Sequence, residues 1–120
     1  DCMKYSDLQR IEKIYSTTNK LLSYIHAASI SQQDVMEQEP LQWTVTTPLY
    51  NIGEHAYYLS NEFKEKYPEV PWAKISGLRH RLVHNYDDTN WSLISSILFD
   101  TLPEFQKSIH MILDKEKGAK

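Results

Sequence analysis

The chain has 120 residues, of which 13 are basic and 16 acidic, and its formal net charge is −3. This length fits one domain with one hydrophobic core, and the acidic balance excludes a strongly basic nucleic-acid-binding surface over the whole molecule. Hydrophobic residues make up 41% of the chain and charged residues 24%, which is typical of a globular protein.

The start of the chain and its single cysteine are typical of a protein of the cytoplasm. Cys2 has no second cysteine to pair with, so no disulfide forms within the chain. The N-terminal stretch DCMKYSDLQR lacks the apolar run of a secretory signal, and no later apolar run is long enough to span a membrane. We therefore expect a cytoplasmic protein without a membrane segment.

The first half of the chain predicts two long helices. Apolar residues recur at helical spacing from about Ser6 to Ser29, and Ser6 is a suitable N-cap. A second apolar stripe predicts a helix from about Pro40 to Lys66. Gly53 lies within this stripe at a cost of about 1 kcal/mol, which the close approach of another helix would explain. The stretch LQWTVTTPLY predicts a break near the start of the second helix.

The second half predicts two further helices, one from about Trp72 to the region of His84 and one from about Trp91 to Lys115. DDTN between them is typical of a turn, and Pro103 predicts a kink in the last helix. Residues 116–120 are expected to fray. Residues 1–120 therefore predict a single all-α domain, an antiparallel four-helix-type bundle with short additional helical turns.

The stretch GLRHRLVHNY, residues 77–86, holds the candidate site. No acidic residue occurs from Val70 to Tyr86, so an anion-binding surface is expected there. On a regular helix Arg79 and Tyr86 share a face, whereas His84 lies about 140° round from Arg79. The three side chains converge only if the helix ends or distorts near His84, or if a second copy of the chain supplies one of them.

The residues of this stretch allow three interpretations. Arg79, His80 and Arg81 suit a solvated helix end, where cations are favourable. His80 and His84 are four residues apart and suit a metal site, but Arg81 stands where a zinc protease needs a glutamate, and its charge opposes a metal ion. An arginine, a histidine and a tyrosine together suit phosphodiester cleavage without a metal.

The stretch PWAKISGLRHRLVHNYDDTNW resembles the HepT-like branch of the HEPN superfamily, whose R-x4-H-x-Y signature falls on Arg79, His84 and Tyr86. His80 stands where many members carry asparagine. The preceding segment YNIGEHAYYLSNEFKEKYPEVPW resembles the family as well, with Ile52-Gly53-Glu54 as the recurring piece. The likeness covers about residues 45 to 113.

This resemblance implies a helical bundle that forms a homodimer and brings two motifs to a shared cleft. Many family members are ribonuclease toxins that use neither metal nor cofactor. They are encoded beside a minimal nucleotidyltransferase antitoxin that attaches AMP to the motif tyrosine, here Tyr86. A bulky anion at Tyr86 would block the cleft and repel the RNA phosphate.

The resulting expectation is an endoribonuclease in which Arg79 and His84 are catalytic and His80, Tyr86 and Glu54 support them. Arg79 stabilises the phosphate charge and His84 transfers a proton, giving a 2′,3′-cyclic phosphate. His80 adds a second titratable group to the pH profile. The alternative is a non-catalytic dimerisation module that binds nucleotide or the nucleotidyltransferase.

Several side chains outside the motif have structural interpretations. Glu54 lies on a polar strip with Tyr50, Tyr57 and Asn61 and either pairs with Arg79 or Arg81 or is an ordinary surface residue. Trp72 and Trp91 are interpreted as core anchors rather than stacking platforms. The remaining histidines, interpreted as structural or solvent-exposed, are His26, His55 and His110.

Overall fold

The computed structural model describes residues 5–83 and 88–118, and within these ranges the regular elements are helical. In chain order the elements are α1 (Asp7–Ala27), α2 (Gln32–Glu37), α3 (Glu39–Tyr57), α4 (Asn61–Lys66), α5 (Trp72–Val83), α6 (Trp91–Ser96), the π-helical turn η3 (Ile97–Thr101) and α7 (Leu102–Gly118). This confirms the predicted all-α fold.

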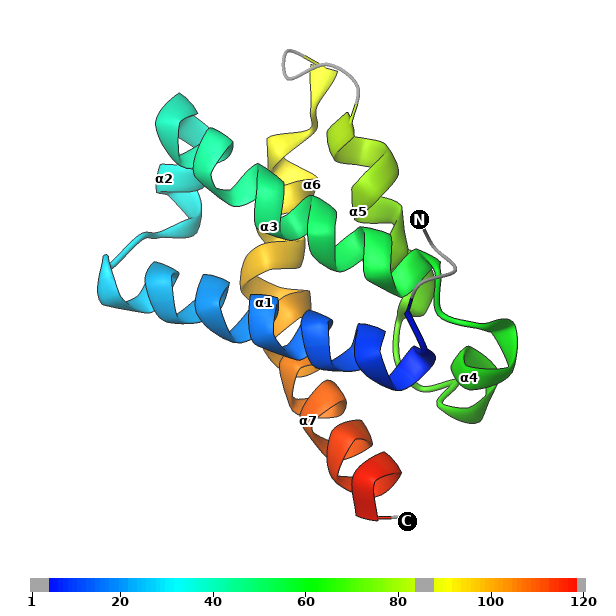
Figure 1. The fold of residues 1–120 in the computed structure, drawn as a ribbon. Coiled ribbons are helices and arrows are strands. Elements are labelled where there is room, and N and C mark those ends of the chain that lie inside the picture. The colour runs from blue at the N-terminus through cyan, green and yellow to red at the C-terminus, as the bar shows by residue number, and fades with distance from the viewer. Residues whose placement is uncertain (1–4, 84–87, 119–120) are drawn as a thin grey trace.

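The long helices form the bundle, and the short ones connect them. In Figure 1, α1 and α3 lie side by side with opposite chain directions, α5 packs against α3, and α7 crosses α1. α6, η3 and α7 follow one another without a loop, so they act as one long helical segment. The short helices α2 and α4 supply short helical turns of the expected kind, although α4 occupies the end of the second predicted helix and no helix was specified for the segment of α2.

The start of α1 is fixed by two sets of hydrogen bonds. Ser6 caps the helix as predicted: the Gln9 backbone N–H donates to Ser6 Oγ (3.1 Å), and the Ser6 N–H donates to Gln9 Oε1 (2.9 Å). The Asp7 carboxylate accepts from the backbone N–H and the hydroxyl of Ser60, at 2.9 and 2.7 Å. The N-terminus of α1 is thereby tied to the turn that follows α3.

The second predicted helix differs from the structure in two respects. It is divided at residues 58–60, where Ser60 caps α4 by accepting from the Phe63 backbone N–H at 3.1 Å. The predicted break near Pro48 is wrong, because α3 continues through this residue. The neighbouring residues Val45 and Leu49 are buried, so core packing holds the helix together although Pro48 contributes no N–H.

The last helical segment adapts to Pro103 by a wider turn. Pro103 has no N–H for the carbonyl one turn back, and the preceding turn is π-helical, with the Leu102 N–H donating to the Ile97 oxygen five residues earlier. α7 then extends to Gly118, into the segment that was predicted to fray. Glu116 accepts from Lys66 Nζ at 2.8 Å and from the Tyr67 hydroxyl, and these contacts fasten the end of α7 to the region of α4.

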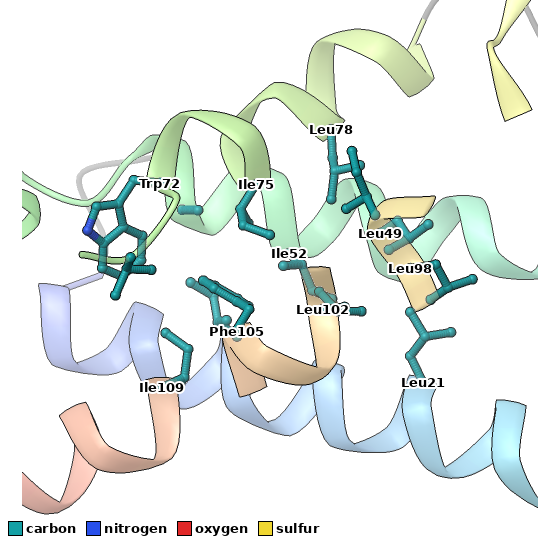
Figure 2. Close-up of a cluster of buried hydrophobic side chains, with 14 of the residues drawn as sticks. Leu21, Leu49, Ile52, Trp72, Ile75, Leu78, Leu98, Leu102, Phe105 and Ile109 are labelled. Atoms are coloured by element: carbon teal, nitrogen blue, oxygen red, sulfur yellow. The ribbon is translucent and has the colours of Figure 1, made fainter. Parts of the chain in front are cut away.

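The core lies where α1, α3, α5 and α7 face one another. Figure 2 shows apolar side chains from all four helices converging, with Trp72 at one end of the cluster. Trp72 is 7% exposed, and its Nε1 donates to the Tyr67 carbonyl oxygen at 2.9 Å, which confirms it as a core anchor. Trp91 is half-buried against the same core. In the described part of the chain, no helix is both long and apolar enough to cross a membrane.

Candidate functional site

The candidate site is built on the contact between α3 and α5, and Gly53 makes this contact close. A Cβ atom at position 53 would lie 2.8 Å from the Arg79 backbone nitrogen and 3.0 Å from the Ile75 carbonyl oxygen. Only glycine fits at that separation, which confirms the predicted close approach of a neighbouring helix. Glu54, the next residue of α3, is therefore held beside the motif arginine.

Arg79 and Glu54 form a charge-assisted hydrogen bond. Arg79 Nε donates to Glu54 Oε1 at 2.6 Å, and the two side chains are 28% and 32% exposed. The hydrogen bond that Arg79 donates to Glu54 raises the pKa of Arg79, so the guanidinium stays charged. Of the two arginines considered for pairing with Glu54, the structure selects Arg79, while Arg81 is exposed near the end of α5.

Two tyrosines at the end of α3 cover the guanidinium of Arg79. Its Cζ lies 4.2 Å from the ring centroid of Tyr57 and 5.6 Å from that of Tyr58. Tyr57 follows Glu54 by three residues on α3, so the two share a face, as the polar strip predicted. Asn61 belongs to α4, beyond the turn, and is not part of this strip. The stacking on Tyr57 was not predicted.

A buried arginine extends the cluster toward α1. Arg10 is 3% exposed, contacts His55 Nδ1 at 3.0 Å and lies 5.3 Å from the Tyr58 ring centroid. Burial, followed by the charge of Arg10, lowers the pKa of His55, so a neutral His55 accepts the hydrogen bond. Sequence reasoning missed Arg10, although its position is in register with Ile14, four residues later on the buried face of α1.

The structure describes part of the R-x4-H-x-Y motif. His84 and Tyr86 lie outside the described residues, so their approach to Arg79 stays a prediction. His80 is described and is exposed on α5. Within residues 5–83 and 88–118, no three His, Cys, Asp or Glu side chains are grouped as metal ligands.

A small cavity lies next to the motif, on the side of α6. Its volume is about 140 Å³, and it is lined by Arg81, Asp88, Asn90 and Ile94. The Asn90 side chain caps α6 by accepting from the Leu93 backbone N–H at 3.0 Å. Arg81 therefore faces the chain that follows the motif, while Arg79 faces α3.

The three remaining histidines agree with their structural interpretation. His55 is buried, and His26 is exposed in the last turn of α1. His110 is exposed on α7 and contacts the Tyr15 hydroxyl through Nδ1 at 3.0 Å. The described groups that contact Arg79 include Glu54 and the two tyrosines.

The all-α bundle, with a glycine-mediated helix contact that holds the motif arginine against a glutamate, agrees with the HEPN-type fold that the sequence resemblance implied. The family model described as "Ribonuclease HepT-like" matches residues 7–112. The chain therefore belongs to the HepT-like ribonuclease family, as the resemblance of its motif indicated.

Curated relatives point to the same family. "Putative RNase TTE0752" of Caldanaerobacter subterraneus subsp. tengcongensis is 36% identical over 88 residues, which cover 73% of this chain and 79% of that protein. "Putative RNase MJ1380" of Methanocaldococcus jannaschii is 27% identical over 99 residues, 82% of this chain and 89% of the relative. "Probable ribonuclease HepT" of Thermococcus cleftensis is 26% identical over 74 residues, 62% and 67% of the two chains. No solved structure matches the chain significantly.

Proposed function

We propose that this protein is a metal-independent endoribonuclease, the toxin of a cytoplasmic toxin–antitoxin pair. The observation that carries the proposal is the restrained guanidinium of Arg79. Its Nε is hydrogen-bonded to Glu54, and Tyr57 lies against its face, so its terminal amino groups can face a phosphate. A guanidinium fixed in this way stabilises negative charge without having to reorganise during the reaction.

The proposed reaction is an attack of the ribose 2′-hydroxyl on the adjacent phosphorus. The bond between the 2′-oxygen and phosphorus forms while the bond to the 5′-oxygen breaks, which leaves a 2′,3′-cyclic phosphate and a 5′-hydroxyl. His84 of one copy accepts the proton of the 2′-hydroxyl, and His84 of a second copy donates a proton to the leaving 5′-oxygen. Arg79 stabilises the negative charge of the crowded phosphate. His80 and Tyr86 support the site from within the same motif.

The test is cleavage of single-stranded RNA, and of DNA of the same sequence, by purified, unmodified protein in the presence of a chelator. We expect RNA fragments that end in a cyclic phosphate, intact DNA, and loss of cleavage in His84→Ala and Arg79→Ala. His26→Ala is the matched control, because it removes an exposed histidine far from the motif in sequence. Fragments with a 5′-phosphate contradict the mechanism. RNA left intact by both wild type and His84→Ala establishes the non-catalytic binding module instead.

The family resemblance supports a second part of the proposal, that a minimal nucleotidyltransferase inactivates the protein by attaching AMP to Tyr86. The tyrosine oxygen attacks the α-phosphorus of ATP, and pyrophosphate leaves. The added anion then repels the RNA phosphate that Arg79 binds. Incubation with the nucleotidyltransferase and ATP is expected to add the mass of AMP to wild type and not to Tyr86→Phe. An equal gain in mass in Tyr86→Phe contradicts this assignment.

A further inference from the structure

A continuous series of alternating cations and tyrosine rings leads from the motif to α1. We call it the cation–tyrosine ladder, and its members are Arg79, Tyr57, Tyr58, Arg10, Tyr5 and Lys13. Arg10 Cζ lies 5.3 Å from the Tyr58 centroid and 5.2 Å from that of Tyr5, and Lys13 Nζ lies 4.9 Å from Tyr5. Each ring is therefore in contact with at least one positive charge.

The rings of the ladder remain accessible although the arginine between them is buried. Tyr57 is 49% exposed, Tyr5 40% and Tyr58 36%, whereas Arg10 is 3% exposed. The buried cation places a positive charge beneath the rings of Tyr5 and Tyr58 without occupying their exposed surface. The ladder thus presents aromatic surface together with positive potential.

Beyond Tyr5, the ladder opens into a shallow hollow on α1. The hollow has a volume of about 460 Å³ and is lined by Tyr5, Gln9, Glu12, Lys13 and Ser16. Its one acidic group, Glu12, pairs with Lys117 of α7 at 3.1 Å. Because this charge is offset, Lys13 keeps the end of the ladder attractive to an anion.

We propose that the cation–tyrosine ladder is the track that binds single-stranded RNA on one side of the phosphate to be cut. Bases stack on the exposed tyrosine rings, Arg79 and Lys13 contact phosphates, and the buried Arg10 contributes its charge from beneath the rings. Stacking on aromatic side chains along a basic path is the usual way of binding a single strand without regard to sequence. The inference rests on the proposed ribonuclease function and names how its substrate is held.

The geometry favours RNA over a second copy of the chain as the occupant. Arginine and tyrosine also occur in protein interfaces, but lysine is depleted there, and the ladder ends at Lys13 beside the Tyr5 ring. The ladder also begins at Arg79, the residue proposed to bind the phosphate that reacts. A strand that enters at Arg79 and continues along the ladder reaches Lys13 without leaving the aromatic surface.

The first test measures binding of a fluorescently labelled RNA of about ten nucleotides, a length suited to a short track, to the His84→Ala protein. Adding Lys13→Glu is expected to weaken binding about tenfold and to reduce its salt dependence, because one phosphate contact is lost. Lys20→Glu makes the same charge change at an exposed position of α1 off the ladder and is expected to bind like the parent. Lys13→Glu is expected to reduce affinity more for this RNA than for a dinucleotide, because a dinucleotide is too short to reach Lys13 from Arg79.

The second test replaces a ring that does not touch Arg79. Tyr5→Leu is expected to weaken RNA binding about tenfold, as loss of one stacked base does, whereas Tyr5→Phe keeps the ring and stays near the parent. Tyr24→Leu is the matched control, because Tyr24 is 45% exposed and lies at the other end of α1. Circular dichroism and the melting temperature identify any variant that fails to fold. If Tyr5→Leu does not fold, the RNA affinity of Lys13→Glu tests the ladder in its place.

Three outcomes overturn the inference. One is that the variants at Tyr5 and Lys13 bind RNA like those at Tyr24 and Lys20. Another is that they convert a dimer to monomers in sedimentation, which assigns the ladder to a subunit interface. The third is that Lys13→Glu reduces affinity equally for the dinucleotide and for the longer labelled RNA. Because binding is measured in a protein without His84, failure of wild type to cleave RNA contradicts the proposed function and leaves this result standing.

Discussion

Arg79 is restrained by two contacts of different kinds. The hydrogen bond to Glu54 fixes the direction of Nε, and the ring of Tyr57, 4.2 Å from Cζ, fixes the plane of the guanidinium. The pair is about one-third exposed, so its contribution to stability is small, about 0–1 kcal/mol. We therefore regard Glu54 as a positioning residue, whose value lies in the orientation of Arg79 rather than in the free energy of unfolding.

Removal of Glu54 is expected to separate activity from stability. Glu54→Gln should lower kcat of RNA cleavage about tenfold, and Glu54→Ala more, because Arg79 loses its orientation. KM and the free energy of unfolding should change little, the latter by less than about 1 kcal/mol. Glu62→Gln, an exposed glutamate of α4, is the control. The role is refuted if kcat stays at the wild-type level in both Glu54 variants, or if their melting temperatures fall enough to account for the loss.

His55 gives the fold a specific dependence on pH. Burial and the charge of Arg10 lower the pKa of His55 below its usual 6.5 in the folded chain. The unfolded chain therefore binds the proton more tightly, and the free energy of unfolding falls as the pH drops from 6.5 toward the folded pKa. Above pH 6.5 this loss is absent.

The measurement is the melting temperature of wild type and His55→Gln between about pH 7.5 and about pH 5.5, the range in which histidine titrates. Glutamine cannot titrate, but its carbonyl oxygen can still accept from Arg10. Wild type should lose more stability over this range than the variant, since the other titrating groups are common to both. Parallel curves for the two proteins would show that His55 does not couple folding to pH.

At the scale of the helices, the contact between α3 and α5 depends on the absence of a side chain at one position. Gly53→Ala brings a Cβ to 2.8 Å from the Arg79 backbone nitrogen, and backbone cannot yield as a flexible side chain does. We expect a loss of about 2 kcal/mol in the free energy of unfolding and reduced cleavage, because α5 moves away from Glu54.

Gly77 of α5 provides the matched control, measured in the same denaturant titration. Its nearest neighbour to an added Cβ is Arg81 Nε at 3.8 Å, an ordinary contact. Gly77→Ala should therefore stabilise the protein by about 0.5–1 kcal/mol through helix propensity alone. Equal effects of the two substitutions would mean that close packing at Gly53 is not what the fold requires.

The helices show which features periodicity predicts and which it misses. The apolar stripes predicted both ends of α1 and the start of α5 to within about two residues. Gly53, which lies in the stripe of the second predicted helix, also predicted the close helix contact that holds Arg79. Periodicity could not reveal the turn at residues 58–60, because Leu59 within the turn and Phe63 after it are both buried and continue the stripe. The π turn before Pro103 also escaped, since a missing donor predicts a kink but not its form.

Partners within the site were predictable where they lie at helical spacing, and for Glu54 the motif offered Arg79 and Arg81 as candidate partners. Glu54 and Tyr57 are three residues apart on α3, so a shared face followed from sequence. The contact of Arg10 with His55 joins positions 45 residues apart, and no local pattern encodes that pairing. The relation of Arg79 to His84 and Tyr86 involves residues outside the described ranges and stays a prediction.

At the scale of the whole molecule, the charge distribution favours one face for the substrate. The chain carries a net charge of −3, yet residues 70–86 contain no acid, so repulsion of RNA elsewhere directs a strand toward α5. Two acidic residues near this face have their negative charge offset by a basic partner: Glu54 pairs with Arg79, and Glu12 pairs with Lys117. An acidic protein can in this way bind an anionic polymer at one place.

The proposed division of acid and base roles between two copies has a quantitative consequence. If one dimer needs both copies of His84, mixed dimers of wild type and His84→Ala are inactive. In a randomly assembled symmetric dimer with equal amounts of the two proteins, roughly one quarter of the activity remains, whereas independent sites leave roughly one half. We expect activity to follow the square of the wild-type fraction when the two proteins are unfolded and refolded together at fixed total concentration. Wild type mixed with His26→Ala should retain full activity in the same series, because both proteins supply His84. A linear decline with His84→Ala would mean that each copy cuts RNA with its own histidine, and the second proton transfer would then belong to another group of the same chain.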